Sequence, residues 1–329
     1  MVLRVLGWIL LSVWACGGAM AADFRVVHRP CDEPCTVAKY VGIMEMSGPI
    51  TPGDAKKFAT MLDKEGGIIG ALTLRSPGGD VAEAMQIGRT VRKRLLRTNA
   101  PGEDVHGRRS CYIGGSVQPS SECVCLSSCF LVYAAGIHRS GHVLGLHRPR
   151  YDEAFFAKLP LEQANARYAA VIEQIRAYLV SMGVGDRYLE RMLRVSSSEM
   201  QILTREEADR DLSGFTPAMA EWLKARCGEV SERERDFVIE WSYYMSLKEK
   251  PYAQLNDGQR AHVAYKSKLA TPEIEKQYLT LANKEASVTT CRNGTLYRER
   301  ERVRPKDEFE GFQEMLGPDG WPMIAPGQR

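Results

Sequence analysis

One short stretch of the chain, CVCLSSCFLVYAAG from Cys123 to Gly136, places two serines directly before an apolar run. Ser127 lies where a strand pattern changes to a helix pattern, a corner that can expose a hydroxyl and leave the N–H of Ser128 free. His147 ends a later strand-like run, GHVLGLH. A serine, a histidine that can take its proton and free N–H groups are the set that acyl transfer requires.

A glycine turn supplies a second element of this chemistry. The sequence SPGGD follows an apolar strand pattern and precedes a helix pattern, so Gly78 and Gly79 lie at the start of a helix. Main-chain N–H groups at such a turn can hold a developing oxyanion.

Each of these residues also has a purely structural interpretation. Ser127 could pack or cap a tight corner, and His147 could be a histidine at a sheet edge that bonds only to backbone. Cys125 and Cys129 are poor candidates for a catalytic thiol, because a thiolate would have to escape oxidation. The C-x-C-x-x-x-C spacing lacks the paired C-x-x-C or neighbouring histidine of common zinc sites, so no metal site is expected.

The N-terminus predicts export. Residues 1–21 contain Arg4, an apolar run and the sequence Ala19-Met20-Ala21, which is the order of a secretory signal peptide. The run is shorter than the roughly 20 residues that span a bilayer. We therefore expect a periplasmic or secreted protein; the alternative is a lipoprotein signal that would make Cys16 the lipidated N-terminus.

Cysteine content fits this location. Removing Cys16 from the nine cysteines leaves eight, an even number that favours disulfides in an exported chain. Cys31 and Cys35 are expected to form a local bridge. Cys111, Cys123, Cys125 and Cys129 are close in sequence, and Cys227 and Cys291 bracket the C-terminal part.

Composition indicates an ordinary globular protein, with 44% hydrophobic residues and a formal net charge of +3. The basic runs at residues 89–97 and 298–306 are interrupted by apolar or acidic residues, as on a solvated helix face. Nucleic acid is therefore not an expected partner.

The elements that must position these residues alternate between strands and helices. Strands are expected at residues 40–48, 67–75, 123–127 and 141–147. Residues 49–65 are expected to form a turn followed by a helix, and further helices are expected at 81–96, 128–136 and 161–183. Asp54 is the expected N-cap of the first helix and Gly136 the expected C-cap of the third. Residues 97–122 are expected to form a long loop or an insertion held by Cys111. This order predicts an α/β fold with a mainly parallel sheet flanked by helices.

The chain becomes helical and highly charged after residue 215. We expect a helical C-terminal extension over residues 216–329 that ends in a Gly/Pro-rich tail. The predicted organisation is thus a signal peptide (1–21), an α/β domain (22–215) and this extension.

Four segments in order, LTLRSPGGDVAEAMQIGRTVR, CLSSCFLVYAAG, GHVLGLHRPR and QILTREEA, resemble the Clp protease proteolytic subunit and its signal-peptide-peptidase relatives in the ClpP/crotonase-like superfamily. More narrowly, the chain resembles the exported Clp-like proteins of Gram-negative bacteria. The resemblance covers roughly Val41 to Phe215. It implies that Ser127, nine positions before Gly136, is the nucleophile, and His147 the base. Gly79 and Ser128 would supply the oxyanion N–H groups.

Two departures from the family pattern concern the base and its acid. The segment between Gly136 and His147 is shorter, and Met200 stands where the family has its triad aspartate. Glu199 is adjacent and could substitute, although neighbouring side chains on an extended segment point opposite ways. Loss of the orienting acid costs a serine protease roughly 10⁴ in rate.

Two hypotheses for the function follow. The first is an exported serine hydrolase, an ATP-independent peptidase without a cofactor, which acts on a peptide or protein and has no ATPase partner because the Clp ATPases are cytosolic. The second is a Clp-like fold without catalysis that acts as a periplasmic binding or assembly module. Acyl-CoA chemistry is disfavoured because an exported protein meets little coenzyme A. A homo-oligomer is compatible with both hypotheses.

Overall fold

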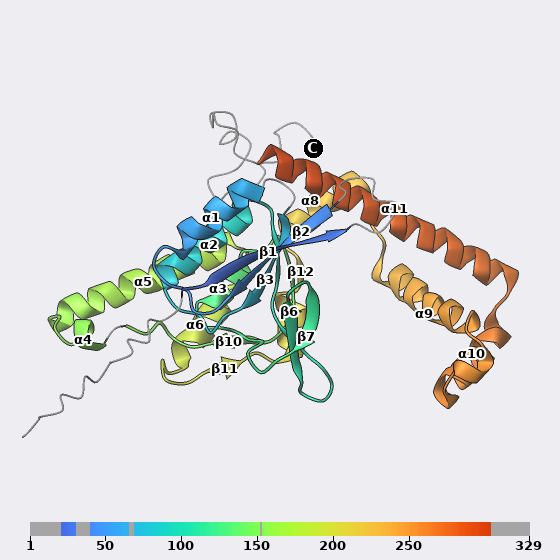
Figure 1. Ribbon diagram of the computed structural model, residues 1–329, viewed down its shortest axis with the longest axis horizontal. Coiled ribbons are helices and arrows are strands. Elements are labelled where there is room, and N and C mark those ends of the chain that lie inside the picture. The colour runs from blue at the N-terminus through green and yellow to red at the C-terminus, as the bar shows by residue number, and fades with distance from the viewer. Residues whose placement is uncertain (1–20, 31–39, 66–68, 152, 304–329) are drawn as a thin grey trace, which may run out of the picture.

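A six-stranded sheet forms the centre of the computed structural model, which describes residues 21–30, 40–65, 69–151 and 153–303 (Figure 1). The strand order is β1 (Asp23–Pro30), β2 (Tyr40–Ser47), β3 (Ile69–Arg75), β4 (Arg97–Asn99), β9 (His138–Ser140) and β12 (Gly214–Phe215). The four inner strands are parallel and the two edge strands are antiparallel to their neighbours. The predicted mainly parallel sheet is confirmed, and β1, β4, β9 and β12 are strands that the sequence did not indicate.

Helices pack on one face of this sheet. Met44, Met46, Leu72 and Leu74 alternate along β2 and β3 and are almost fully buried in one apolar cluster. The cluster includes side chains of α1 (Asp54–Glu65), α2 (Val81–Lys93), α3 (Cys129–Ala134), α5 (Leu161–Ser181) and α6 (Asp186–Arg194). The predicted flanking helices are confirmed.

A second, three-stranded sheet lies at the end of β3. It has the order β11 (Gln201–Ile202), β10 (Leu144–Leu146) and β8 (Cys125–Leu126), with β8 parallel and β11 antiparallel to β10. A parallel bridge between Ser76 and Cys125 joins it to the segment that follows β3. Short helices α4 (Glu153–Phe156) and α7 (Arg205–Asp211) complete this part of the chain.

Two expected helix caps differ from the structure. Asp54 is the first residue of α1, and its carboxylate accepts hydrogen bonds from the N–H groups of Thr51 and Ala22. Helix α3 ends at Ala134, two residues before Gly136. A Cβ atom on Gly136 would lie 2.2 Å from Thr98 Oγ1, so this glycine permits close approach to β4 instead of capping the helix.

The expectation of a long loop over residues 97–122 is wrong. Besides β4, this stretch forms a small antiparallel sheet of β5 (Gly102–Glu103), β6 (Arg109–Ile113) and β7 (Ser116–Pro119). Gly114 and Gly115 both have positive φ angles (62° and 90°) between β6 and β7, as a tight hairpin turn requires. Their N–H groups donate to the Glu45 carboxylate on β2, so the hairpin covers the face of the main sheet opposite the helices.

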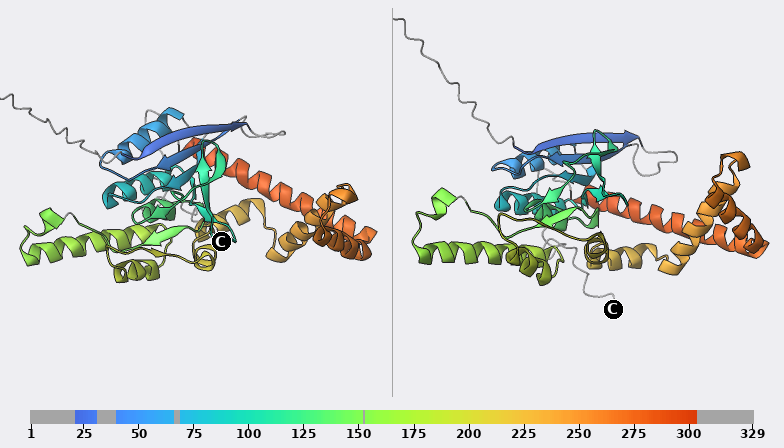
Figure 2. Two further views of the ribbon diagram at one scale, coloured as in Figure 1. Left: turned by 60° about the horizontal axis from the view of Figure 1, so that its bottom comes forward. Right: turned by 90° about the horizontal axis from the view of Figure 1, so that it is seen from below.

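The C-terminal part is helical, as expected. It consists of α8 (Pro217–Cys227), α9 (Glu232–Lys248), the short 3-10 helix η2 (Tyr252–Gln254), α10 (Asp257–Leu269) and α11 (Pro272–Arg302). Helices α9, α10 and most of α11 project from the sheet as an arm (Figures 1 and 2). The end of α11 returns to the sheet, where Leu296 packs with Leu95 and Ile137. The boundary between domain and extension at residue 215 stays a prediction.

Three disulfides hold the described chain: Cys111–Cys123, Cys125–Cys129 and Cys227–Cys291. They include every cysteine among the described residues and are typical of a protein from an oxidising compartment. The predicted signal peptide, the Cys31–Cys35 bridge and the Gly/Pro-rich tail lie outside the described residues. Within the described ranges, no helix has the length and apolar character needed to cross a membrane.

Candidate functional site

Ser127 occupies a strained corner between β8 and α3. Its φ angle is 56°, in the left-handed region that non-glycine residues rarely adopt and that costs of order 1–3 kcal/mol. The main chain fixes this conformation on both sides: the Ser127 N–H donates to the Gly145 oxygen (2.8 Å), and the Ser127 oxygen accepts from the Phe130 N–H (3.0 Å). The side chain of Ser127 remains partly exposed. Strain of this kind is concentrated at functional sites.

The glycine turn lies directly against this corner. A Cβ atom on Gly78 would lie 2.6 Å from the Leu126 oxygen, 2.7 Å from Ser127 Cβ and 3.0 Å from the Ser128 nitrogen. Both turn glycines have positive φ angles, 94° for Gly78 and 149° for Gly79. Only glycine allows the turn to adopt this shape and to approach the serine so closely.

Ile50 holds the glycine turn from its other side. The Ile50 N–H donates to the Gly78 oxygen (2.9 Å), and the Ile50 oxygen accepts from the Asp80 N–H (2.8 Å). This parallel pairing leaves the N–H of Gly79 pointing away from Ile50. Within the described part of the chain, neither the Gly79 N–H nor the Ser128 N–H donates a hydrogen bond to another protein atom. Both groups therefore lack a protein acceptor; Gly79 is an exposed residue, whereas Ser128 is buried.

The Cys125–Cys129 disulfide brackets the serine. Cys125 is the first residue of β8 and Cys129 the first residue of α3, and both are fully buried. The bond joins the strand to the helix across the corner. It therefore restricts the same backbone that holds Ser127 in its left-handed conformation.

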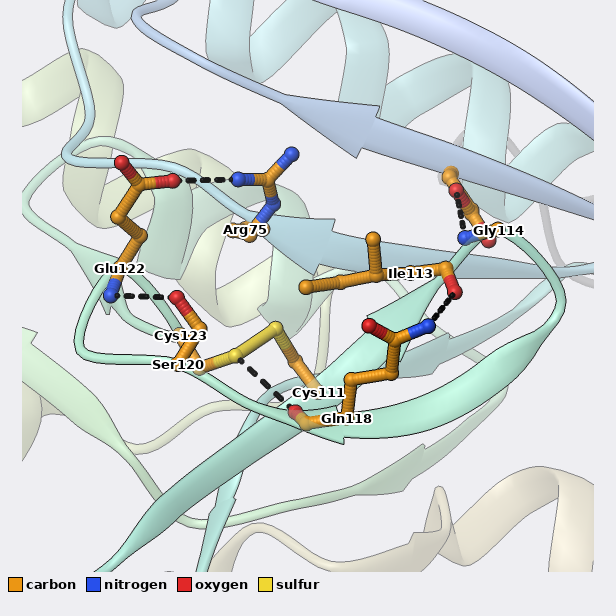
Figure 3. The surroundings of a disulfide bond; sticks show 9 residues. Arg75, Cys111, Ile113, Gly114, Gln118, Ser120, Glu122 and Cys123 are labelled. Carbon is orange, nitrogen blue, oxygen red and sulfur yellow. Dashed lines mark hydrogen bonds and ion pairs between the residues drawn. A yellow bond between two sulfur atoms is a disulfide. The ribbon is translucent and has the colours of Figure 1, made fainter.

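The strand that leads into this corner is fixed by a second disulfide. Cys111 on β6 is bonded to Cys123, and Glu122 next to it forms an ion pair of 2.7 Å with Arg75 at the end of β3 (Figure 3). The Ser76 N–H donates to the Val124 oxygen (2.8 Å). These contacts keep the end of β3 beside the start of β8.

His147 lies one residue beyond β10, the strand next to β8. The parallel register pairs Gly145 with Leu126, so Ser127 and His147 leave neighbouring strands at the same end. The ring is partly exposed, and its Nδ1 atom lies 2.7 Å from the main-chain oxygen of Arg148. Among the described contacts, no hydrogen bond joins His147 to Ser127. Catalytic hydrogen bonds are often long in proteins without substrate.

Glu199 and Met200 lie at the start of β11. The antiparallel register ends with the pair Leu146 and Gln201, and extending it by one residue, forward from Leu146 and backward from Gln201, places Met200 opposite His147. A Cβ atom on Gly145 would lie 2.7 Å from Met200 Sδ, which puts the methionine side chain over β10. Glu199 is exposed, and within the described residues its carboxylate has no ion pair.

A groove of about 1030 Å³ begins at this point and runs along α6 and α7. Glu199, Met200 and Gln201 form its end nearest His147. Its charged side chains are largely paired with one another. A hydrogen bond from Arg191 (2.6 Å) is the main cause of the lowered pKa of Glu207.

Asp211 is the most strongly held carboxylate in the groove. Arg210, Arg187 and Tyr188 donate to it at 2.9, 2.8 and 3.1 Å. The Arg210 hydrogen bond contributes most to lowering the Asp211 pKa to about 2. The groove is therefore lined by internally neutralised ion pairs, with Glu199 as an unpaired carboxylate at one end.

Sequence reasoning missed two residues that shape this site. Ile50 fixes the glycine turn, and Gly145 accepts the Ser127 N–H and leaves room for Met200. The glycine inside the short run GHVLGLH was the one available signal, because glycine in a strand often marks close approach. Nothing in the local sequence links Ile50 to the turn.

Within the described ranges, no group of three histidine, cysteine, aspartate or glutamate side chains is arranged to bind a metal ion.

Comparison with known proteins gives no family. No protein-family model and no curated protein matches the chain. Solved structures do match, among them a mutant of 1510-N, a membrane-bound stomatin-specific protease. It is 16% identical, covers 56% of this chain and 83% of its own, and has a TM-score of 0.33. A similarity of this size does not assign a function to this chain.

Proposed function

We propose that this chain is an exported serine hydrolase, an ATP-independent peptidase of the ClpP/crotonase-like type, with Ser127 as nucleophile and His147 as base. The observation that carries the proposal is the left-handed φ angle of Ser127 at a strand-to-helix corner, against which the glycine turn is packed. Such a corner presents a hydroxyl beside free N–H groups, as hydrolases with a serine nucleophile require.

The chemistry follows from these groups. Ser127 Oγ attacks the substrate carbonyl carbon while its proton passes to His147, and the carbonyl electron pair moves to the oxygen. The N–H groups of Gly79 and Ser128 bind that oxyanion. His147 then protonates the leaving amine, and a water molecule, deprotonated by His147, releases the acyl group from Ser127. The centre is a Ser127–His147 dyad, or a triad if Glu199 orients the histidine.

Location and partners are part of the proposal. The N-terminal export pattern and the three disulfides support a periplasmic site of action, where no ATP-driven unfoldase is present. The substrate is a peptide or protein that reaches the corner without mechanical unfolding. The groove along α6 and α7 supports an extended chain as the substrate, although its lining includes Glu199 and Met200 and not Ser127 or His147. Assembly into a homo-oligomer is compatible with this activity.

A fluorophosphonate probe tests the proposal, because it reacts covalently only with an activated serine. The wild-type protein should be labelled, and Ser127→Ala and His147→Ala should each abolish labelling. Ser128→Ala is the matched control, because it removes only a buried hydroxyl without a partner among the described residues and keeps the main-chain N–H. Equal labelling of wild type and Ser127→Ala, or no labelling of folded wild type, would favour the non-catalytic binding module instead.

A further inference from the structure

His147 makes a hydrogen bond that determines which ring nitrogen carries the proton. Its Nδ1 atom lies 2.7 Å from the main-chain oxygen of Arg148. A carbonyl oxygen only accepts hydrogen bonds, so Nδ1 must be the donor. The neutral ring therefore has its lone pair on Nε2, the nitrogen that takes the serine proton in a serine hydrolase.

The carbonyl that accepts this bond is itself held in place. The Arg148 N–H, in the peptide unit before this carbonyl, donates to the Val195 oxygen at 3.1 Å, which ties Arg148 to the segment after α6. Pro149 follows and restricts Arg148 to extended backbone conformations. These two features restrict the directions that the Arg148 carbonyl can take, as the orienting role requires.

Among the described residues, no carboxylate lies at the position best placed to orient His147. Residues directly opposite in an antiparallel pair share a face and have Cβ atoms about 4.5–5.5 Å apart. The last pair of β10 and β11 is Leu146 with Gln201, and extending this register by one residue gives the position opposite His147 to Met200. Glu199 is one residue further along, in a turn closed by the hydrogen bond from its N–H to the Ser196 oxygen (3.1 Å), and it is exposed to solvent.

We propose that the main-chain carbonyl of Arg148 is the positioning group of His147, so that the centre works as a Ser127–His147 dyad without a carboxylate. This inference rests on the proposed function. A carbonyl fixes the tautomer as a carboxylate does, but it has no full charge with which to stabilise the imidazolium. A carboxylate placed at position 200 should therefore make His147 a stronger base.

The experiment measures the rate of fluorophosphonate labelling against pH for the wild type, Met200→Asp, Met200→Asn and Glu199→Gln. Met200→Asp should label about tenfold faster and shift the acid limb of the profile upward by about one pH unit, because a nearby negative charge favours the protonated imidazole. Met200→Asn, equal in size and uncharged, should not shift the limb. The acid limb of Glu199→Gln should coincide with that of wild type.

Two results in this series overturn the inference while leaving the proposed function intact. One is a displaced acid limb and slower labelling in Glu199→Gln, which would assign the orienting role to Glu199. The other is an unchanged profile for folded Met200→Asp. A wild-type protein that is not labelled at Ser127 overturns the proposed function, and the inference with it.

A second measurement does not depend on activity. Nitrogen-15 NMR of the imidazoles distinguishes the two neutral tautomers, with His147→Gln identifying the signals. Neutral wild-type His147 should carry its proton on Nδ1. A proton on Nε2 would contradict the hydrogen bond on which the inference rests.

Discussion

Gly78 and Ser127 touch across two strand ends: a Cβ atom on Gly78 would lie 2.7 Å from Ser127 Cβ. We expect Gly78→Ala to abolish labelling of Ser127, because the new methyl group must push the serine corner or the glycine turn out of place. Backbone atoms of Leu126 and Ser128 lie equally close, so no flexible side chain can relieve the clash. Probe labelling and thermal unfolding of the variant measure the two effects.

Gly53→Ala is the matched control for this substitution. Gly53 has almost the same φ angle, 97° against 94°, but nothing lies within 4 Å of its Cβ position. It should show the conformational cost alone, about 1 kcal/mol, with labelling unchanged. Equal loss of labelling in both variants would mean that the contact with Ser127 has no special role.

The disulfide that brackets Ser127 should matter more for activity than for stability. We expect the double variant Cys125→Ala/Cys129→Ala to lose about 2 kcal/mol of unfolding free energy, because the bond closes a short loop. Its labelling rate should fall at least tenfold, since the left-handed conformation of Ser127 loses a constraint. Urea unfolding and the labelling rate of the folded variant check the two values.

Cys111→Ala/Cys123→Ala provides the comparison. This bond closes a longer loop, so its removal should cost more stability, about 3 kcal/mol, and have a smaller effect on labelling. If the labelling rate falls in proportion to the loss of unfolding free energy in both double variants, the Cys125–Cys129 bond has no specific effect on the serine corner.

His138 should make the protein less stable in mild acid. Burial, with a further contribution from the Arg97 charge, lowers the pKa of His138 to about 4. The unfolded chain, with a histidine pKa near 6.5, therefore binds more protons than the native state between about pH 6.5 and 4. The stabilising effect is complete above pH 6.5 and is lost as the pH falls through this window.

Urea unfolding at several pH values should show this loss in the wild type and a weaker dependence in His138→Gln. His106→Gln, at an exposed position, should keep the wild-type dependence. If the unfolding free energy of His138→Gln depends on pH as steeply as that of the wild type, His138 is not the group responsible for the loss of stability.

Arg92 is expected to stabilise the fold and to take no direct part in the reaction of Ser127. Its buried guanidinium donates to the oxygens of Ala135 (2.8 Å), Met182 (3.2 Å) and Ala134 (3.4 Å), at the C-terminal ends of α3 and α5. Arg92→Met should lower the unfolding free energy by about 3 kcal/mol, because these carbonyls lose their donor. Arg89→Met, one turn earlier and exposed over the Tyr178 ring, should cost about 0.5–1 kcal/mol. Urea unfolding of the two variants measures this difference, and equal losses would contradict it.

Local patterns in the sequence were sufficient for the main elements of the fold. The apolar runs around Met44 and Leu72 and the helical spacing from Val81 onward are properties of short segments, so β2, β3 and α2 could be predicted. The same holds for the helical C-terminal part. The hairpin of β6 and β7 could also have been found, because Gly114-Gly115 between two short strands is a local signal.

The short strands and the site geometry could not be read in this way. Strands β9, β11 and β12 have only two or three residues each, too few for a period, and they form because a neighbouring strand supplies their hydrogen bonds. The sequence determined that a serine corner, a glycine turn and a histidine occur in this chain, together with cysteines that can form disulfides. Only the tertiary structure decided that Gly78 presses on Ser127, that Ile50 holds the turn and that Met200 lies opposite His147, because these relations join residues far apart in the chain through register and close packing.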